Sequence, residues 1–548
     1  MLRLDRTGDL WWKNGIVYCL DVETYQDSDG DGIGDFPGLT SRVDHLAELG
    51  VTCVWLMPFF PSPNCDDGYD ISDYYGVDPR LGTLGEFVEF LRTARDRGIR
   101  VIVDLVLNHT SDQHPWFVES RASRDSPRRD WYVWRDEPSD APAGIAFPDK
   151  ETSNWEFDPQ TGQYYLHRFY RFQPDLNVAS PGVRDEIGRI VAFWLALGVS
   201  GFRMDAVPFL LELDGISHPV DGDPKGWLRE LRAFIGRRSG DAVLVGEVNT
   251  ALQDLSSYFG GADGDALHME FAFLLNQSLW LSLARGEAEP LEECIASLPH
   301  VPYENGWATF LRNHDELSLD KLTVSQRQEV FAAFGPRAAM QMYGHGLRRR
   351  TATMLGGDGP LLRMAWSLML SLPGTPVIFM GDEIGMGEQL AIPDRYAVRV
   401  PMQWTAGATG GFTTAAKKDM VRPQPGGAFA PGRVNVAAQR REPDSLLRFI
   451  ERLTHVRRIT PEIGWGASTL IETLHPAVFA HRCDWEGSTV VAVHNLGAER
   501  VRADLPLGPG NRTAEDILAE TERRHRVGRD GTLSLDLDGH SGTWLRLA

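Results

Sequence analysis

The chain has 548 residues, a net charge of −21 and 5 cysteines. This length is sufficient for one large domain together with one or two smaller ones. The acidic charge argues against nucleic acid or an anionic membrane as a partner, and it suits a protein that acts on a neutral small molecule.

The cysteines indicate a reducing compartment, because their number is odd and no pair has C-x-x-C spacing. Residues 1–20 carry several charges and lack the apolar core of a signal peptide. The apolar run at 361–380 is interrupted by Arg363, Pro373 and Pro376, which indicates a buried helix and strand rather than a membrane span. We therefore expect a cytoplasmic protein with no membrane partner, compatible with a monomer or a homo-oligomer.

Eight apolar runs of strand length alternate with amphipathic, helix-length stretches. The runs are continuous, as expected for parallel strands that are covered on both faces. They span residues 15–25, 51–59, 100–108, 201–207, 241–249, 268–273, 307–316 and 375–383. Eight strand–helix units predict a (β/α)8 TIM barrel in the α/β class, with its active site at the carboxyl ends of the strands.

Two further segments interrupt or follow this pattern. Residues 109–174 are rich in Trp, Asp, Arg and Pro and have little periodicity, so we expect a small inserted domain after the third strand. Short β-type runs follow a helix at 445–463 and predict a C-terminal antiparallel β-sandwich. The predicted division is a catalytic barrel at 1–108 and 175–463, an inserted domain at 109–174 and a sandwich at 464–548.

Three carboxylates, Asp205, Glu247 and Asp315, stand at the ends of the fourth, fifth and seventh predicted strands. Arg203 precedes Asp205 by two residues, so both side chains share a face and the cation favours an ionised nucleophile. Glu247 follows the apolar segment 243–246, which would raise its pKa and keep it protonated for acid catalysis. A surface ion pair is the plain alternative for Asp205 alone. Three acids at equivalent strand ends favour glycoside cleavage with retention.

Five ordered motifs carry a family resemblance. DLVLNH (104–109), QPDLN (173–177), GFRMDAV (201–207), VGEVN (245–249) and FLRNHD (310–315) resemble signature regions of the α-amylase superfamily, glycoside hydrolase family 13. The resemblance implies Asp205 as nucleophile, Glu247 as acid/base and Asp315 as stabiliser of the transition state. It also implies that a sugar in the −1 subsite is held by Asp66, Tyr69, His109, Arg203, His314 and Arg399.

Within the superfamily, DDGYDISDYYGVDPRLGT (66–83) and SLPGTPVIFMGDEIGMG (371–387) resemble the members that interconvert maltose and trehalose. This implies α-retaining glucosyl transfer through a covalent glucosyl-enzyme, without an organic cofactor. The stretch 248–252 departs from that pattern on the acceptor side, so an α-1,4-glucosidase of the maltase type is the alternative. A non-enzymatic, transporter-associated scaffold is disfavoured because all three acids are present.

The acidic segment 27–35 predicts a cation-binding loop, because oxygen-bearing residues alternate there with glycines. Closely spaced like charges repel unless a cation neutralises them, so we expect structural Ca²⁺, with Mg²⁺ possible, rather than a bare acidic surface loop. The twelfth position is Gly38, so the loop is not a complete EF-hand. The expected ligands are Asp27, Asp29, Asp31, Ile33 and Asp35.

The family resemblance implies a second metal site, which would join the inserted domain to the barrel. Its expected ligands are Asn108, Asp175 and Glu212, with the backbone oxygens of Phe209 and Leu210.

Overall fold

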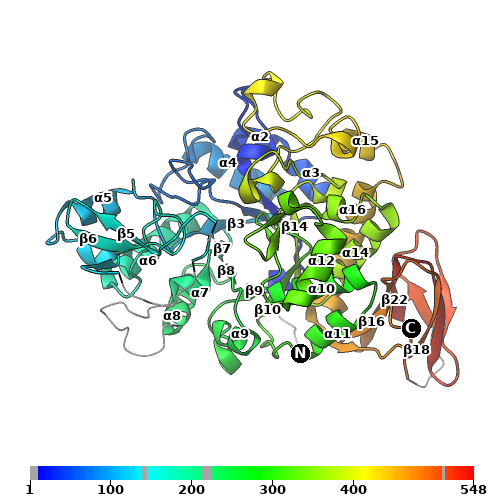
Figure 1. Cartoon of the computed structure of the whole chain (residues 1–548). Coiled ribbons are helices and arrows are strands. Elements are labelled where there is room, and N and C mark those ends of the chain that lie inside the picture. Colours follow the sequence, from blue (N-terminus) through cyan, green and yellow to red (C-terminus); the bar gives the residue numbers. More distant parts are fainter. Residues whose placement is uncertain (1–9, 139–144, 148, 212–224, 509–512) are drawn as a thin grey trace.

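The computed structural model describes residues 10–138, 145–147, 149–211, 225–508 and 513–548. Eight parallel strands close into a barrel at its centre, in the order β1, β14, β10, β9, β8, β7, β3 and β2 (Figure 1). Each expected run overlaps one of these strands, so the predicted (β/α)8 barrel is confirmed. The strands are β1 (Val17–Leu20), β2 (Cys53–Leu56), β3 (Arg100–Leu105), β7 (Gly201–Met204), β8 (Val243–Gly246), β9 (Met269–Phe271), β10 (Gly306–Phe310) and β14 (Thr375–Phe379).

Amphipathic helices surround the barrel, and α4 shows why they form. Thr83 and Glu86 make a reciprocal capping box at its start, and its apolar face buries Phe87, Phe90 and Leu91. The helices of the barrel domain include α1 (Val22–Tyr25), α2 (Phe36–Ser41), α3 (Val43–Glu48), α4 (Leu84–Asp96), α6 (Pro181–Leu197), α7 (Val207–Leu210), α8 (Gly226–Gly236), α9 (Leu252–Tyr258), α10 (Phe273–Arg285), α11 (Glu289–Ser297), α12 (Val324–Phe334), α13 (Thr351–Met354), α14 (Gly359–Ser371), α15 (Val436–Gln439), α16 (Leu446–Arg458) and α17 (Pro461–Trp465).

Strands β7 and β8 lie unusually close at their start. Gly201 has φ +142°, and a Cβ at this position would stand 2.2 Å from the carbonyl oxygen of Val243. Only glycine fits there. The register continues to Met204 beside Gly246, so the residues that follow these two strands emerge as neighbours.

Residues 109–174 leave the barrel between β3 and β7, where a small inserted domain was expected. A bridge from His109 to Asp175 ties the two ends of this segment together, and a second bridge joins Tyr132, within the segment, to Leu176. Its three-stranded sheet has the order β4 (Trp134–Arg135), β6 (Gln163–Leu166) and β5 (Trp155–Asp158), and its helix is α5 (Pro115–Ala122). A second three-stranded sheet follows β10 and contains β11 (Leu317–Ser318), β13 (Gly346–Leu347) and β12 (Gln341–Met342).

The chain ends in antiparallel sheets with a core of their own, as the sequence predicted. The single helix expected at 445–463 is wrong, because Pro461 cannot continue α16 and instead opens α17. Among the described residues, no helix is both long and apolar enough to cross a membrane. The C-terminal strands are β15 (Ala467–Leu470), β16 (Val478–Trp485), β17 (Ser488–Asn495), β18 (Val501–Pro506), β19 (Thr513–Asp516), β20 (Arg524–Arg526), β21 (Thr532–Leu537) and β22 (Ser541–Leu547).

Candidate active site

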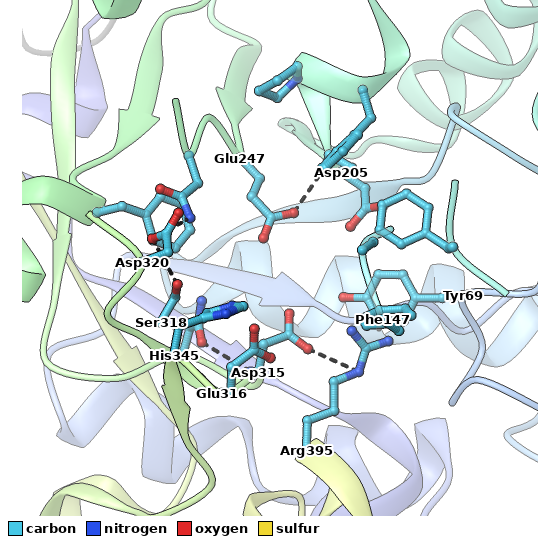
Figure 2. A pocket seen from close by; sticks show the side chains of 18 of the residues that line it. Tyr69, Phe147, Asp205, Glu247, Asp315, Glu316, Ser318, Asp320, His345 and Arg395 are labelled. Carbon is cyan, nitrogen blue, oxygen red and sulfur yellow. Dashed lines mark hydrogen bonds and ion pairs between the residues drawn. The ribbon is translucent and has the colours of Figure 1, made fainter. Parts of the chain in front are cut away.

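A cavity of about 420 Å³ lies at the carboxyl ends of the barrel strands, and Asp205, Glu247 and Asp315 all line it (Figure 2). Asp205 directly follows β7 and Glu247 directly follows β8, whereas Asp315 lies in the loop after β10. The volume is within the range of small-molecule binding pockets. The structure therefore brings together the three acids that the sequence singled out.

Arg203 connects the acids from inside the barrel. Its Nη1 donates to Asp205 Oδ1 and to Asp104 Oδ1, each at 2.6 Å, and its Nη2 donates to Glu247 Oε2, also at 2.6 Å. The guanidinium is buried and lies over the ring of Trp55. Asp104 was not among the predicted site residues, although a lone acid within the apolar run 100–108 was a usable signal.

The two acids proposed for the covalent chemistry have raised pKa values. Burial raises the pKa of Asp205 to about 6, and the nearby Arg203 opposes this increase. Burial raises the pKa of Glu247 to about 7, again against the effect of Arg203. Near neutral pH, Asp205 is therefore mostly ionised while Glu247 is partly protonated, which is the division of labour that a nucleophile and an acid require.

A turn after Asp205 positions Glu247. Ala206 has φ +47°, a left-handed conformation that is uncommon for a residue with a side chain. Its amide donates to Glu247 Oε2 at 3.1 Å. The backbone conformation after β7 is thus part of the site, since it supplies a donor to the carboxylate of the neighbouring strand.

Asp315 is held as a carboxylate by a cationic and aromatic setting. Arg399 Nη2 donates to Asp315 Oδ1 at 2.7 Å, and His314 Nε2 lies 3.1 Å from Oδ2. Burial alone would raise the pKa of Asp315, but His314, Arg395 and Arg399 lower it well below its usual value. Asp315 therefore differs from the other two acids in being fully ionised near neutral pH.

The predicted sugar-binding residues divide into two groups. Asp66, Tyr69 and His109 line the cavity itself. Arg203, His314 and Arg399 lie behind the lining, since they are almost fully buried and contact the acids. Tyr69 joins the groups, because its hydroxyl lies 2.6 Å from His314 Nε2.

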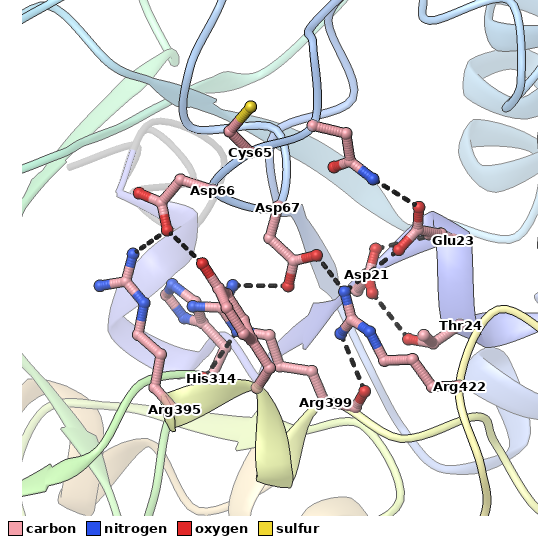
Figure 3. A network of polar contacts seen from close by, with 12 residues as sticks. Asp21, Glu23, Thr24, Cys65, Asp66, Asp67, His314, Arg395, Arg399 and Arg422 are labelled. Atoms are coloured by element: carbon pink, nitrogen blue, oxygen red, sulfur yellow. Dashed lines mark hydrogen bonds and ion pairs between the residues drawn. The ribbon is translucent and has the colours of Figure 1, made fainter. Parts of the chain in front are cut away.

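Arg395 is a lining residue that the sequence reasoning missed. Its Nη2 donates to Asp66 Oδ1 at 2.7 Å (Figure 3). Its Nε lies 3.3 Å from Asp315 Oδ1. Tyr396 also donates to Asp66 Oδ1, at 2.8 Å. The only signal in the sequence was the position of Arg395 four residues before Arg399, and no spacing rule links that segment to the DDGYD turn.

The far side of the cavity has a polar group centred on Asp320. Its Oδ1 accepts from Asn249 Nδ2 at 3.2 Å, from Gln277 Nε2 at 2.9 Å and from Ser318 Oγ at 3.0 Å. Lys321 pairs with the other carboxylate oxygen at 2.8 Å. Through Asn249 this group includes part of the stretch 248–252, where the sequence departs from the subfamily pattern, and it places hydrogen-bond donors and acceptors along the cavity.

The acidic loop brings together three of its expected oxygen ligands. The carboxylates of Asp27, Asp29 and Asp35 each place an oxygen within 4.8 Å of the others. Asp31 does not join this group, and its Oδ1 accepts from the amide of Ile33 at 2.7 Å. Three converging carboxylate oxygens fit a hard divalent cation such as Ca²⁺.

The second expected metal site is less suited to an ion. Asn108 Nδ2 donates to Asp175 Oδ1 at 3.1 Å, and Arg168 Nη1 pairs with Asp175 Oδ2 at 2.6 Å. Arg168 thus already neutralises the one carboxylate that the described residues supply. Phe209 and Leu210 belong to α7, and Glu212 lies outside the described residues.

Comparison with known proteins adds independent evidence. A family model described as the α-amylase catalytic domain matches residues 22–334 and 328–466, which is most of the chain. The chain belongs to the α-amylase family. The barrel, the inserted segment and the three converging acids of this α-amylase family member agree with that assignment.

Two relatives within the family are named trehalose synthases. The trehalose synthase of Thermus thermophilus is 42% identical over 502 residues, and the match covers 91% of this chain but 52% of that protein. This chain therefore spans about half the length of that relative. The trehalose synthase/amylase of Mycobacterium tuberculosis is 39% identical over 545 residues, covering 98% of this chain and 90% of that protein.

Solved structures of the α-amylase family share the whole architecture. The trehalulose synthase from Pseudomonas mesoacidophila MX-45 superposes with a TM-score of 0.75 at 28% identity. The alignment covers 98% of this chain and 99% of that one.

Proposed function

We propose that this chain interconverts maltose and trehalose by glucosyl transfer with retention of the α configuration. The observation that carries the proposal is the arrangement around Arg203, which holds Asp205 and Glu247 at one side of a cavity whose other side is polar. Relatives that are named trehalose synthases, at about 40% identity over most of the chain, support this choice of substrates.

The reaction follows from the charge states of the acids. Asp205 attacks the anomeric carbon of the donor glucose while Glu247 gives its proton to the glycosidic oxygen, so that glucose leaves and a covalent glucosyl-enzyme forms. The freed glucose then turns and presents its anomeric hydroxyl. The oxygen of this hydroxyl attacks the anomeric carbon of the glucosyl-enzyme and displaces Asp205. Glu247, now a carboxylate, takes the proton from the hydroxyl in the same step. Two displacements at one carbon retain the α configuration.

Asp315 stabilises the positive charge that develops on the donor sugar between these displacements, since it stays ionised throughout. Asp66 and Arg395 contact each other in the cavity lining and are placed to bind the same donor sugar. The Asp320 group would bind the freed glucose and orient it for the second step.

The test is incubation with maltose and identification of every product by NMR. We expect trehalose together with some free glucose. Labelled external glucose should enter trehalose poorly, because the leaving glucose stays in the cavity. If maltose gives only glucose and no α,α-linked disaccharide forms, the chain is an α-1,4-glucosidase instead.

We also propose that Ca²⁺, or Mg²⁺, binds the acidic loop through Asp27, Asp29 and Asp35. The ion would have a structural role, since Asp27 also accepts from the amides of Gly30 and Gly32 and so organises the loop after α1. No step of the proposed reaction depends on it. Cytoplasmic location and self-association stay predictions, which cell fractionation and light scattering respectively would check.

A further inference from the structure

Three aromatic rings from different segments pack together, and one of them, Phe147, lines the cavity. The other two rings are Tyr170 and Tyr343. Phe147 stacks on Tyr170 with ring centroids 4.7 Å apart, and it contacts Tyr343 with centroids 5.3 Å apart. These rings form a small hydrophobic cluster that is separate from the barrel core. Phe147 and Tyr170 belong to the inserted domain, whereas Tyr343 belongs to the barrel domain.

Tyr343 occupies an unusual backbone position. It lies in the turn that joins β12 to β13, where Tyr343 has φ +53° and Gly344 has φ +68°. The amide of His345 donates to the carbonyl of Met342 at 3.3 Å and closes the turn. Positive φ at both central residues is the pattern of a type I′ hairpin turn, whose first central position favours Asn, Asp or Gly.

A tyrosine at that position is therefore locally unfavourable. Its Cβ makes the left-handed conformation strained, and a smaller residue would form the turn more easily. The side chain nevertheless is buried against Phe147. An observed local strain that a tertiary contact compensates supports a functional hypothesis for the residue that carries it.

The contact reaches the cavity through Phe147. Phe147 lines the cavity, and its ring lies 5.1 Å from the guanidinium carbon of Arg395, the residue that joins Asp66 and Asp315 (Figure 2). Tyr343 itself is not a lining residue. Its contact with Phe147 can therefore influence the reaction by holding that ring, and with it the inserted domain, over the sugar. Tyr343 also contacts the ring of His345, a lining residue, with centroids 6.1 Å apart, and the Phe147 variant separates the two routes.

We propose that Tyr343 is a positioning residue that sets how often the glucosyl-enzyme reacts with the retained glucose rather than with water. By fixing Phe147 over the cavity, it excludes water and retains the leaving glucose during the reaction. The inference rests on the proposed function, because it concerns the fate of the same intermediate.

The deciding variant is Tyr343→Asn, which removes the ring but provides a residue that the type I′ turn favours. With maltose as substrate, we expect the ratio of glucose to trehalose to rise about fivefold, as expected for the loss of one aromatic pair. The melting temperature should be unchanged or higher, because the turn itself is relieved of strain. Tyr343→Phe keeps the ring and should show the same ratio of glucose to trehalose as the wild type.

Phe157→Ala is the matched control. Phe157 is an aromatic residue of the same inserted domain, but it is 48% exposed and does not line the cavity. This variant should leave the product ratio unchanged. Phe147→Leu should reproduce the effect of Tyr343→Asn, since Phe147 is the ring through which Tyr343 acts.

An unchanged product ratio in Tyr343→Asn would overturn the inference, as would a change that Phe157→Ala reproduces. If wild-type protein forms no trehalose at all, the proposed function fails, and the role of Tyr343 is then tested with a second assay. Transfer from p-nitrophenyl α-glucoside to added glucose, relative to hydrolysis, should then fall in Tyr343→Asn. A ratio equal to that of the wild type in this second assay would contradict the role of Tyr343 separately.

Discussion

Arg203 Nη2 donates to Glu247 Oε2 at 2.6 Å, so a residue of β7 holds the residue that follows the neighbouring strand β8. Its other terminal nitrogen holds Asp205. One buried cation thus lowers the pKa of both Asp205 and Glu247, while burial raises both. Their pKa values are about 6 for Asp205 and about 7 for Glu247.

Because Asp205 must be ionised and Glu247 protonated, we predict a bell-shaped pH dependence of kcat/KM. Activity should fall below about pH 6, because Asp205 gains a proton and loses its nucleophilicity. It should fall above about pH 7, because Glu247 loses the proton that the leaving group needs. Initial rates with maltose between pH 4.5 and 9, at constant ionic strength, would measure the profile. Glu247→Gln with α-glucosyl fluoride, whose fluoride needs no proton, should lack the alkaline limb; retention of that limb would assign it to another group.

Asp205→Asn should reduce turnover by about 10⁴-fold, as loss of a covalent catalyst does, while the protein stays folded. The amide cannot form the glucosyl ester but can still accept a hydrogen bond from Arg203. Rates with maltose and circular dichroism would be measured together. Asp44→Asn, which alters an exposed ion pair with Arg97 far from the cavity, is the control. Turnover of Asp205→Asn near the wild-type level would remove this residue from the nucleophile role.

Removal of divalent cations should lower the melting temperature and leave the kcat of the folded enzyme near its starting value. Binding to the native state alone stabilises that state, so EDTA withdraws this contribution and Ca²⁺ restores it. Asp29→Asn should abolish the response, because Asp29 belongs to the converging group. Asp31→Asn is a matched control from the same loop. A chelator response that persists in Asp29→Asn would place the ion elsewhere.

Glu270→Gln should stabilise the protein at alkaline pH. Glu270 lies on β9, and neither carboxylate oxygen has a hydrogen-bond partner among the described residues. Burial raises its pKa well above the usual value, with Lys225 opposing. The wild type therefore loses stability as pH rises above the unfolded pKa of about 4.3, because unfolding releases a proton.

The variant removes that release, so its advantage should be near zero at pH 4.5 and about 1–3 kcal/mol at pH 8. Urea unfolding at both pH values would measure the difference. The exposed Glu289→Gln change serves as the control and should show no comparable pH dependence. A stability advantage of Glu270→Gln that is equal at both pH values would mean that proton release is not its cause.

The sequence alone determined the barrel and the position of its acids. Continuous apolar runs predict buried parallel strands, and the carboxyl ends of such strands meet at one face. The proximity of Asp205, Glu247 and Asp315 could therefore be predicted from the sequence alone. The order of the small sheets and the break at Pro461 were harder, because short strands and helix ends carry weak local signals.

Only the tertiary structure decided which side chains complete the cavity. Arg395 reaches Asp66 across 329 residues, and Tyr343 meets Phe147 from another domain. Periodicity records which face of an element is buried, but it does not record which loops converge above a barrel. It also could not separate Asp31 from Asp27, Asp29 and Asp35, because the folded backbone of the loop decides which carboxylates converge. Residue spacing set the chemistry of the strand ends, whereas contacts between distant loops determined what surrounds them.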